Sequence, residues 1–350
     1  MFAQAHTPEY VSPEDLDLYL EQGWFRMGQT IFTTNFLHFK DQLYSAIWLR
    51  ILLNDLASDS TQIKLFKRNA VFRTTIKPAE LTDDKEELYI KYKQSLPFQP
   101  SESLSHLLFG RNDSHDTVYN TYEVTVHDGE RLIACGFFDI GETSAAGISS
   151  FYDPDYKKYS LGKYLIYSKI EYCKNLKLQY FYPGYFVPGY SFFDYKLTIG
   201  KSALEFLHLA SQQWFYIELF SSEHVPLNAM IDKLTVVQEK LVELKLETSV
   251  VKYEYFDSNL IPALRDAGLF DFPVFLYCPG ESGDGINPIL VYDVRDDQYH
   301  LLKCFPIWKP DQLNEDLSFY SAYFIKSILE IHATSNAQEM AEVFLRSLKV

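Results

Sequence analysis

Residues 147–190 constrain the fold more than any other stretch, because a strand, a polar turn, a helix and a second strand follow one another there without a break. Residues 148–152 include an isoleucine and two aromatic residues, and Asp-Pro-Asp at 153–155 ends this strand because proline has no amide donor for a central ladder. Apolar residues recur at helical spacing over 161–176, and residues 178–187 have the composition of the next strand. We therefore expect a helix that lies on a sheet and connects two of its strands.

The turn before this helix is the place where the sequence predicts chemistry. Ser160 is expected to cap the helix, and the amides of a helix N-terminus point outward, where an anion or an acyl oxygen binds. Asp153 and Asp155 place two carboxylates beside it. The same pattern is also typical of a strand-ending turn without function, and the residues alone leave that alternative open.

The preceding residues predict a sheet that is mostly antiparallel. Residues 119–126 and 132–140 are expected to be strands, and Asp128-Gly129 between them is a strong hairpin signal. Residues 61–77 alternate in the manner of a strand or a strand pair with basic side chains outward, and residues 78–93 predict a helix. This order of elements predicts an α+β fold.

Residues beyond 214 predict a second α/β unit without a catalytic motif. A helix is expected from Ser222 or Pro226 to about Leu246, because an apolar stripe runs along it. The other expected elements are strands at 250–256 and 273–278, a hairpin of 288–294 with 299–305, and helices at 318–331 and 337–348.

Several motifs, in the same order along the chain, resemble those of arginyl-tRNA-protein transferases. They are Gly23-Trp24-Phe25-Arg26-Met27-Gly28, Lys67-Arg68-Asn69-Ala70, the strand 131–140, Phe151-Tyr152-Asp153-Pro154-Asp155 with Ser160-Leu161-Gly162, and Tyr182-Pro183-Gly184-Tyr185. The resemblance covers residues 15–210. It implies a fold related to the GCN5-type N-acetyltransferases, with a mixed, mostly antiparallel sheet and flanking helices.

The resemblance also implies an activity, the transfer of an amino acid of the arginine or leucine class from charged tRNA to a protein N-terminus, with acidic N-termini as suspected acceptors. The aminoacyl ester is already activated, so the enzyme mainly aligns the amine and accepts its proton. The residues expected to act in catalysis are Asp153, Asp155, Tyr195 and Lys196. Those expected to bind the donor are Tyr152, Ser160, Leu161, Gly162 and Tyr185, and those expected to bind tRNA are Lys64, Lys67 and Arg68.

The chain departs from the family pattern in two places. Residues 191–196, Ser-Phe-Phe-Asp-Tyr-Lys, keep Tyr195 and Lys196, but an aromatic residue replaces the family's earlier lysine and its later arginine-proline pair is missing. Closely spaced cysteines that bind a metal or an iron-sulfur cluster in the family are replaced here by residues 33–39, in which His38 stands alone. We therefore expect neither a metal nor another cofactor.

The charge of the chain limits how it binds nucleic acid. A net charge of −15 and a pI near 5.0 argue against broad nonspecific binding, because phosphate contacts need surface lysine and arginine. A tRNA ligand needs only a local basic face. Basic residues crowd two stretches, Lys64, Lys67, Arg68, Arg73 and Lys77 in one and Lys157, Lys158, Lys163, Lys169, Lys174 and Lys177 in the other. These stretches are equally typical of solvated faces of a strand and a helix.

Length and hydropathy set the outer bounds. We expect three parts, an N-terminal region at 1–100, an acetyltransferase-like core at 101–214 and a C-terminal extension at 215–350. No apolar run is long enough to span a bilayer, no leader pattern opens the chain, and four scattered cysteines do not make a disulfide framework. A cytoplasmic protein that does not enter a membrane is the expectation.

Two other functions remain open from the sequence. One is an acyl-CoA-dependent N-acyltransferase, which would be expected to carry a glycine-rich pyrophosphate loop before the helix, where this chain has only Ser160-Leu161-Gly162. The other is an inactive, transferase-like binding or scaffold protein. Binding of charged tRNA separates the aminoacyltransferase from both.

Overall fold

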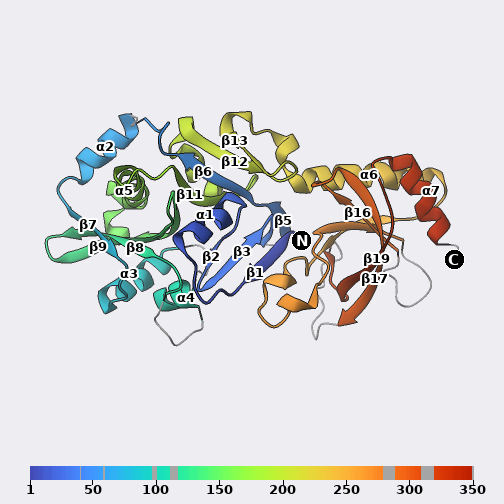
Figure 1. Cartoon of the computed structure of the whole chain (residues 1–350), viewed down its shortest axis with the longest axis horizontal. Coiled ribbons are helices and arrows are strands. Elements are labelled where there is room, and N and C mark those ends of the chain that lie inside the picture. Colours follow the sequence, from blue (N-terminus) through green and yellow to red (C-terminus); the bar gives the residue numbers. More distant parts are fainter. Residues whose placement is uncertain are drawn as a thin grey trace.

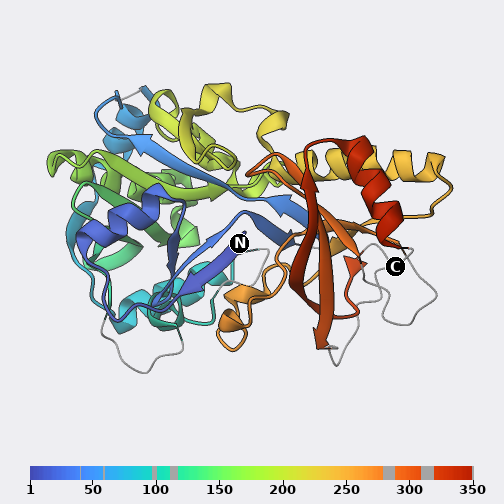
Figure 2. The same ribbon diagram turned by 45° about the vertical axis from the view of Figure 1, so that its right-hand side comes forward.

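The chain folds into two lobes that lie side by side (Figures 1 and 2). The computed structural model describes residues 1–39, 41–57, 60–96, 101–110, 117–278, 288–308 and 319–348. The first lobe is built on an eight-stranded sheet and the second on a six-stranded sheet, and a three-stranded sheet belongs to the N-terminal residues between them. Helix α6 (Pro226–Glu243) leads into the second lobe.

The eight-stranded sheet confirms the predicted α+β class, a mixed and mostly antiparallel sheet with flanking helices. Its strands in spatial order are β13 (Gln213–Tyr216), β12 (Leu204–His208), β6 (Ile47–Leu52), β11 (Tyr180–Phe186), β10 (Ser144–Tyr152), β9 (Arg131–Ile140), β8 (Thr121–Asp128) and β7 (Arg73–Pro78). Among these pairs, β10 and β11 run parallel and the other six are antiparallel. A parallel pair needs a crossover connection, and α5 (Leu161–Asn175) supplies it.

Helices cover both faces of this sheet. Neighbouring residues of β9 point to opposite faces, so Phe138 packs in the core beneath α5 while Phe137 packs against α3 (Asp83–Lys93) and α4 (Leu104–Phe109). Helix α2 (Ser60–Asn69) lies against α5, where the ring of Phe66 meets that of Tyr164. The predicted hairpin of β8 and β9 is confirmed, with Gly129 at positive φ in its turn.

The N-terminal residues add two small sheets. One has the order β1 (Ala3–His6), β3 (Thr30–Thr34) and β2 (Phe25–Met27), and the other pairs β4 (Phe36–Phe39) with β5 (Gln42–Ser45). Helix α1 (Pro13–Glu21) begins at Ser12, whose hydroxyl accepts a hydrogen bond from the amide of Asp15. The chain start also contacts the second lobe, because the Phe2 ring packs edge-on against Phe272.

The second lobe has its own core. Its sheet has the order β18 (Phe319–Tyr320), β14 (Ser249–Tyr253), β15 (Val274–Tyr277), β16 (Ile289–Asp293), β17 (Gln298–Trp308) and β19 (Phe324–Thr334). Helices α6 and α7 (Ala337–Ser347) bury their apolar stripes on this sheet. None of the helices described combines the length and the apolar character that crossing a membrane requires. The division of the chain at residues 100 and 214 stays a prediction.

Three local predictions are wrong. Residues 60–69 form α2 rather than a strand, because Leu65 and Asn69 turn inward at helical spacing and the Asn69 side chain binds the carbonyl of Tyr159. The predicted helix at 318–331 is β18 and β19, because pairing with β17 satisfies the backbone of an isoleucine-rich segment. Ser160 does not cap α5 through its side chain, because a 3₁₀ helix, η1 (Pro154–Tyr159), precedes it and leaves Ser160 in the left-handed region.

A buried arginine connects the small N-terminal sheet to the large one. Arg26 on β2 donates from Nη1 to Asp139 Oδ1 on β9 and to Thr121 Oγ1 on β8, both at 2.8 Å. Its other nitrogens reach the carbonyl oxygens of Leu108 and Gly28. The side chains of Arg26 and Asp139 are 2% and 0% exposed. Such a pair is costly to break, because removing one partner leaves a buried charge without compensation.

We predict that Arg26→Met lowers the free energy of unfolding by about 3–5 kcal/mol, as expected for a buried pair that loses one partner. The double variant Arg26→Met, Asp139→Leu should recover part of this loss, because no charge is left unpaired. Urea unfolding measures both. Lys233→Met is the control, since its ion pair with Asp297 is exposed and should contribute less than about 1 kcal/mol. A loss at Arg26 no larger than at Lys233 would contradict the role given to the buried pair.

Candidate functional site

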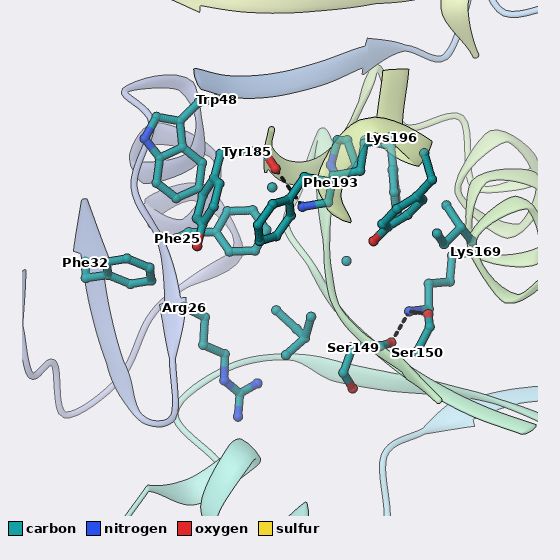
Figure 3. Close-up of a pocket in the computed structure, with 17 residues that line it drawn as sticks. Phe25, Arg26, Phe32, Trp48, Ser149, Ser150, Lys169, Tyr185, Phe193 and Lys196 are labelled. Atoms are coloured by element: carbon teal, nitrogen blue, oxygen red, sulfur yellow. Dashed lines mark hydrogen bonds between the residues drawn. The ribbon is translucent and has the colours of Figure 1, made fainter. Parts of the chain in front are cut away.

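A cavity of about 290 Å³ lies between β2, β10, β11 and the 3₁₀ helix η2 (Ser191–Thr198) (Figure 3). Residues that line it come from seven elements, β2, β3, β6, β10, α5, β11 and η2. They are Phe25, Arg26, Phe32, Trp48, Gly147, Ile148, Ser149, Ser150, Ile166, Lys169, Phe181, Pro183, Gly184, Tyr185, Phe193, Tyr195 and Lys196. The cavity therefore exists only when the N-terminal sheet is seated on the large sheet.

One wall of the cavity is aromatic. The Trp48 ring stacks on Phe25 with centroids 5.4 Å apart and meets Tyr185 edge-on at 5.1 Å. Phe32 and Phe193 extend this wall, at 6.1 Å from Trp48 and 5.5 Å from Tyr185. Burial raises the pKa of Tyr185 to about 12, so this ring stays neutral. The wall offers an apolar surface for a side chain or a base.

Lys196 points its amino group into the cavity from η2 (Figure 3). Its Nζ donates to the backbone carbonyl of Tyr185 at 2.8 Å and lies 5.3 Å and 5.2 Å from the ring centroids of Tyr185 and Phe193. None of the ion pairs found among the described residues includes it. Burial without a carboxylate lowers the pKa of Lys196 to about 7. A lysine of this kind is able to exchange a proton at neutral pH.

Gly184 makes room for this amino group. A Cβ at position 184 would lie 3.1 Å from Lys196 Nζ, and the backbone there has φ +86°, which favours glycine. The Tyr182-Pro183-Gly184-Tyr185 motif therefore has a structural reason. It brings β11 close to Lys196 without blocking it.

Lys169 on α5 is a second desolvated lysine beside the cavity. It is 1% exposed, and its Nζ donates to the carbonyl oxygens of Phe137 and Ser149 at 2.9 Å and 2.6 Å and to Ser150 Oγ at 3.1 Å. Burial lowers the pKa of Lys169 to about 7. The sequence places Lys169 in an exposed basic stretch, and this prediction is wrong. Lys169 follows Leu161 and Leu165 at helical spacing, so it lies on the face of α5 that packs on the sheet.

Lys169 binds β10 where the pairing of this strand with β9 is irregular. The register of β10 against β9 shifts between Gly147 and Ser149, so Ile148 falls out of the ladder next to the cavity. The hydroxyl of Ser149 is buried and has no hydrogen-bond partner among the described residues. A buried hydroxyl without a partner is costly unless a ligand binds it, which makes Ser149 a candidate donor to a substrate oxygen.

Asp153 and Asp155 lie outside the cavity. Asp153 is 2% exposed, and it forms ion pairs with Lys91 at 2.6 Å and with Arg131. Burial alone would raise the pKa of Asp153, but the hydrogen bond from Lys91, the amide of Asp155 and the charge of Arg131 outweigh it and lower this pKa. Asp155 is exposed and shares Lys91. Assigning the proton acceptor to either carboxylate stays a prediction.

The other predicted site residues divide into two groups. Tyr185, Tyr195 and Lys196 line the cavity. Tyr152, Ser160, Leu161 and Gly162 do not, because Leu161 is buried in the core and the Tyr152 ring covers Gly162, where a Cβ would lie 3.3 Å from it. Sequence reasoning missed Phe25, Trp48, Ser149 and Lys169. Phe25 belongs to the Gly-Trp-Phe-Arg motif, and the motif alone assigns no function to this side chain.

Helix α2 and η1 bring the two predicted basic stretches together. Arg68 Nη1 donates to the carbonyl of Lys158 at 3.2 Å. The side chains of Lys64, Lys67 and Arg68 on α2, and of Lys157 and Lys158 on η1, are exposed. We call these five residues the α2 basic face. The described parts of the chain contain no group of three or more His, Cys, Asp or Glu residues that could bind a metal. The expected absence of a metal stays a prediction.

Known proteins similar to this chain share one kind of chemistry. A family described as arginine-tRNA-protein transferase, C terminus, matches residues 63–205. Aspartate/glutamate leucyltransferase of Leptospira interrogans is 33% identical over 54% of this chain and 73% of that protein. The protein of the same name from Vibrio cholerae is 28% identical over 61% of this chain and 87% of its own length.

Among solved structures, the ribosomal-protein-S18-alanine N-acetyltransferase of Escherichia coli covers 30% of this chain and 61% of that chain, at 19% identity and a TM-score of 0.21.

We predict that Lys169 makes the stability of the fold depend on pH. The pKa of Lys169 is about 7 in the folded chain and near 10.4 for an unfolded lysine, so between these values the unfolded state binds more protons and stability rises with pH. From about pH 7.5 to about pH 9.5, the unfolding free energy of Lys169→Met should rise about 2 kcal/mol less than that of the unaltered protein. Urea unfolding at both pH values measures the difference. The exposed Lys157→Met is the control, and equal slopes for Lys169→Met and the unaltered protein would show that Lys169 is charged in the fold.

Proposed function

The chain belongs to the arginyl- and leucyl-transferase family of aminoacyl-tRNA-protein transferases, and we propose that it transfers leucine from charged tRNA to an N-terminal aspartate or glutamate. The observation that carries this proposal is the chemistry of the cavity. Its walls are aromatic and cationic, and no Asp or Glu is found among the described residues that line it.

The cavity favours leucine over arginine as the amino acid that the charged tRNA carries. An arginyl side chain in a buried site needs a carboxylate, because an unpaired guanidinium is costly to desolvate. The basic groups that line the cavity are Arg26, Lys169 and Lys196, and none of them offers a guanidinium the carboxylate it needs. A leucyl side chain requires only apolar contact, and Phe25, Trp48 and Tyr185 offer it.

The same charges favour an acidic acceptor. Arg26 is paired with Asp139 and Lys169 is bonded to neutral acceptors, so Lys169 contributes positive potential at the cavity wall whenever it is protonated. Aspartate or glutamate at the N-terminus of the acceptor is attracted to this potential, and arginine or lysine is repelled. The names of the leucyltransferases from Leptospira and Vibrio agree with this choice.

The reaction needs one proton acceptor and one oxygen-stabilising donor. The neutral α-amine of the acceptor attacks the ester carbonyl carbon, a C–N bond forms, and the bond to the terminal ribose oxygen of tRNA breaks. We assign Lys196 Nζ as the base that accepts the proton of the attacking amine, and Lys196 then donates this proton to the leaving ribose oxygen. Ser149 Oγ is assigned to donate to the carbonyl oxygen as negative charge develops on it.

The tRNA is proposed to bind on the α2 basic face. Exposed lysine and arginine contact phosphates without reading sequence, as expected for a protein whose specificity lies in the aminoacyl group and the acceptor. Charged tRNA and its protein acceptors meet in the cytoplasm, and the proposal places the protein there.

Transfer to defined peptides tests the proposal. The purified protein is incubated with leucyl-tRNA or arginyl-tRNA and with peptides that differ only in an N-terminal Asp, Glu, Ala or Arg, and the products are read by mass spectrometry. We expect leucine on the Asp and Glu peptides. Arginine added in preference to leucine, or equal addition to all four peptides, would overturn the assigned specificity.

We predict that Lys196→Ala and Lys196→Arg each lower kcat by about 10²-fold, because neither variant accepts a proton at neutral pH. In the unaltered protein the rate should fall as pH falls through about 7, where Lys196 becomes protonated. In both variants only the titration of the acceptor amine, with a pKa of about 7.7–8.0, should remain in the pH profile. Full activity of Lys196→Arg would show that the residue acts through its charge and not as a base.

We predict that reversing Lys64, Lys67 and Arg68 to Glu weakens tRNA binding and lowers the slope of log affinity against log salt by about 2–3 units, since each lost phosphate contact removes close to one unit. Filter binding over a range of salt concentrations measures both quantities. The control reverses three exposed cations of the second lobe, Lys245, Lys303 and Arg346, with the same change in net charge. An equal effect of the two triple variants would mean that net charge, and not the α2 basic face, governs binding.

A further inference from the structure

A second and larger cavity, of about 960 Å³, lies between the first lobe and the second. Its first-lobe wall comes from the β2–β3 turn, from α4 and from Ile148, and its second-lobe wall from residues 257–265. This volume is at the upper end of the range of about 300–1,000 Å³ that is usual for ligand sites. We call it the interlobe cleft.

The interlobe cleft adjoins the candidate active site. Arg26 and Ile148 line both cavities. Ile148 is the residue that falls out of the β10 ladder, beside the Ser149 hydroxyl. The two cavities therefore lie on either side of Arg26 and Ile148, and a chain whose amine lies in the smaller cavity is next to the larger one.

The walls of the cleft suit a polypeptide. Met27 from the first lobe and Ile261 from the second are each 47% exposed at its rim, which is high for large apolar side chains. Arg265 bonds to Thr7 through Nη1, and its buried Nε has no hydrogen-bond partner among the described residues. The cleft therefore offers apolar contacts and one unused donor, the combination of groups that is usual for a binding site.

The charge of the second lobe argues against tRNA in this cleft. Residues 215–350 contain 11 Lys and Arg against 21 Asp and Glu, whereas residues 1–214 contain 21 against 26. A lobe of this net charge disfavours the approach of phosphates, and the charged side chains that line the cleft itself are Arg26, which is paired with Asp139, Arg265 and Asp257. The α2 basic face also lies at the end of the first lobe that is remote from the second lobe (Figures 1 and 2).

We propose that the interlobe cleft binds the acceptor polypeptide beyond its first two residues, so that the second lobe is an acceptor-binding element. This inference rests on the proposed function, because it places the acceptor amine in the smaller cavity. Donor and acceptor then approach from opposite sides, tRNA over α2 and the polypeptide between the lobes. The second lobe, which lies beyond the matched family residues, acquires a role in the selection of protein substrates.

Two acceptors of different length test this proposal. One is a dipeptide with an N-terminal Glu, too short to enter the cleft, and the other extends the same dipeptide into a longer chain. Ile261→Glu places a charge on the apolar rim and should raise KM for the longer peptide about tenfold, the effect of losing one well-placed contact. KM for the dipeptide, KM for charged tRNA and kcat should stay unchanged. Arg265→Ala removes the guanidinium from the second-lobe wall of the cleft and should also raise KM for the longer peptide.

Val242→Glu is the matched control, because Val242 is 59% exposed on α6 in the same lobe and does not line the cleft. An unchanged KM for the longer peptide in Ile261→Glu, or an equal effect of Val242→Glu, would overturn the proposal. A raised KM for charged tRNA would assign the cleft to tRNA instead.

Direct binding separates this inference from the proposed function. Fluorescence anisotropy of the labelled longer peptide should show weaker binding to Ile261→Glu than to the unaltered protein or to Val242→Glu, whether or not leucine is transferred. If this binding pattern is observed but no leucine is transferred, the assigned activity is rejected and the cleft is retained as a peptide site. Equal binding to all three proteins would reject the cleft.

Discussion

The ion pair of Arg26 with Asp139 determines how the N-terminal sheet sits on the large sheet. One guanidinium reaches β8, β9 and the end of α4 from β2, and both charged side chains are almost fully buried. The aromatic wall of the candidate active site depends on this seating, because Phe25 adjoins Arg26 on β2 and Trp48 belongs to the large sheet. Arg26 also lines the interlobe cleft, so one buried interaction positions both cavities.

Desolvation gives the two lysines of the site their reactivity. Lys196 and Lys169 lack carboxylate partners among the described residues, and burial lowers the pKa of each to about 7. Asp153 has the opposite environment, since two cations hold it in the charged state. A carboxylate held in this way is a poor proton acceptor, whereas a lysine whose ammonium is disfavoured is a good one. This contrast is why the proposed base is Lys196.

The sequence predicts elements whose signals are local. The hairpin of β8 and β9 follows from Asp128-Gly129 between two apolar strands, and α5 with its flanking strands follows from periodicity and proline. The expectations for residues 61–69 and 324–331 are wrong because short amphipathic segments fit either period, and packing on α5 or pairing with β17 decides between them. The cavity could not be predicted, because Phe25, Trp48 and Tyr185 are distant in sequence and meet only in the fold. The motifs identified Lys196 and Tyr185, but not the burial that gives the lysine its function.

A crystal structure with leucine joined through a stable amide to 3′-amino-3′-deoxyadenosine, a mimic of the end of charged tRNA, would locate the aminoacyl group. We predict the leucyl side chain against Phe25, Trp48 and Tyr185, with the amide carbonyl near Ser149 and the linkage within reach of Lys196. A leucyl group bound instead at the start of α5, beside Asp153 and Asp155, would contradict this prediction and would place the chemistry at the turn that the sequence first suggested.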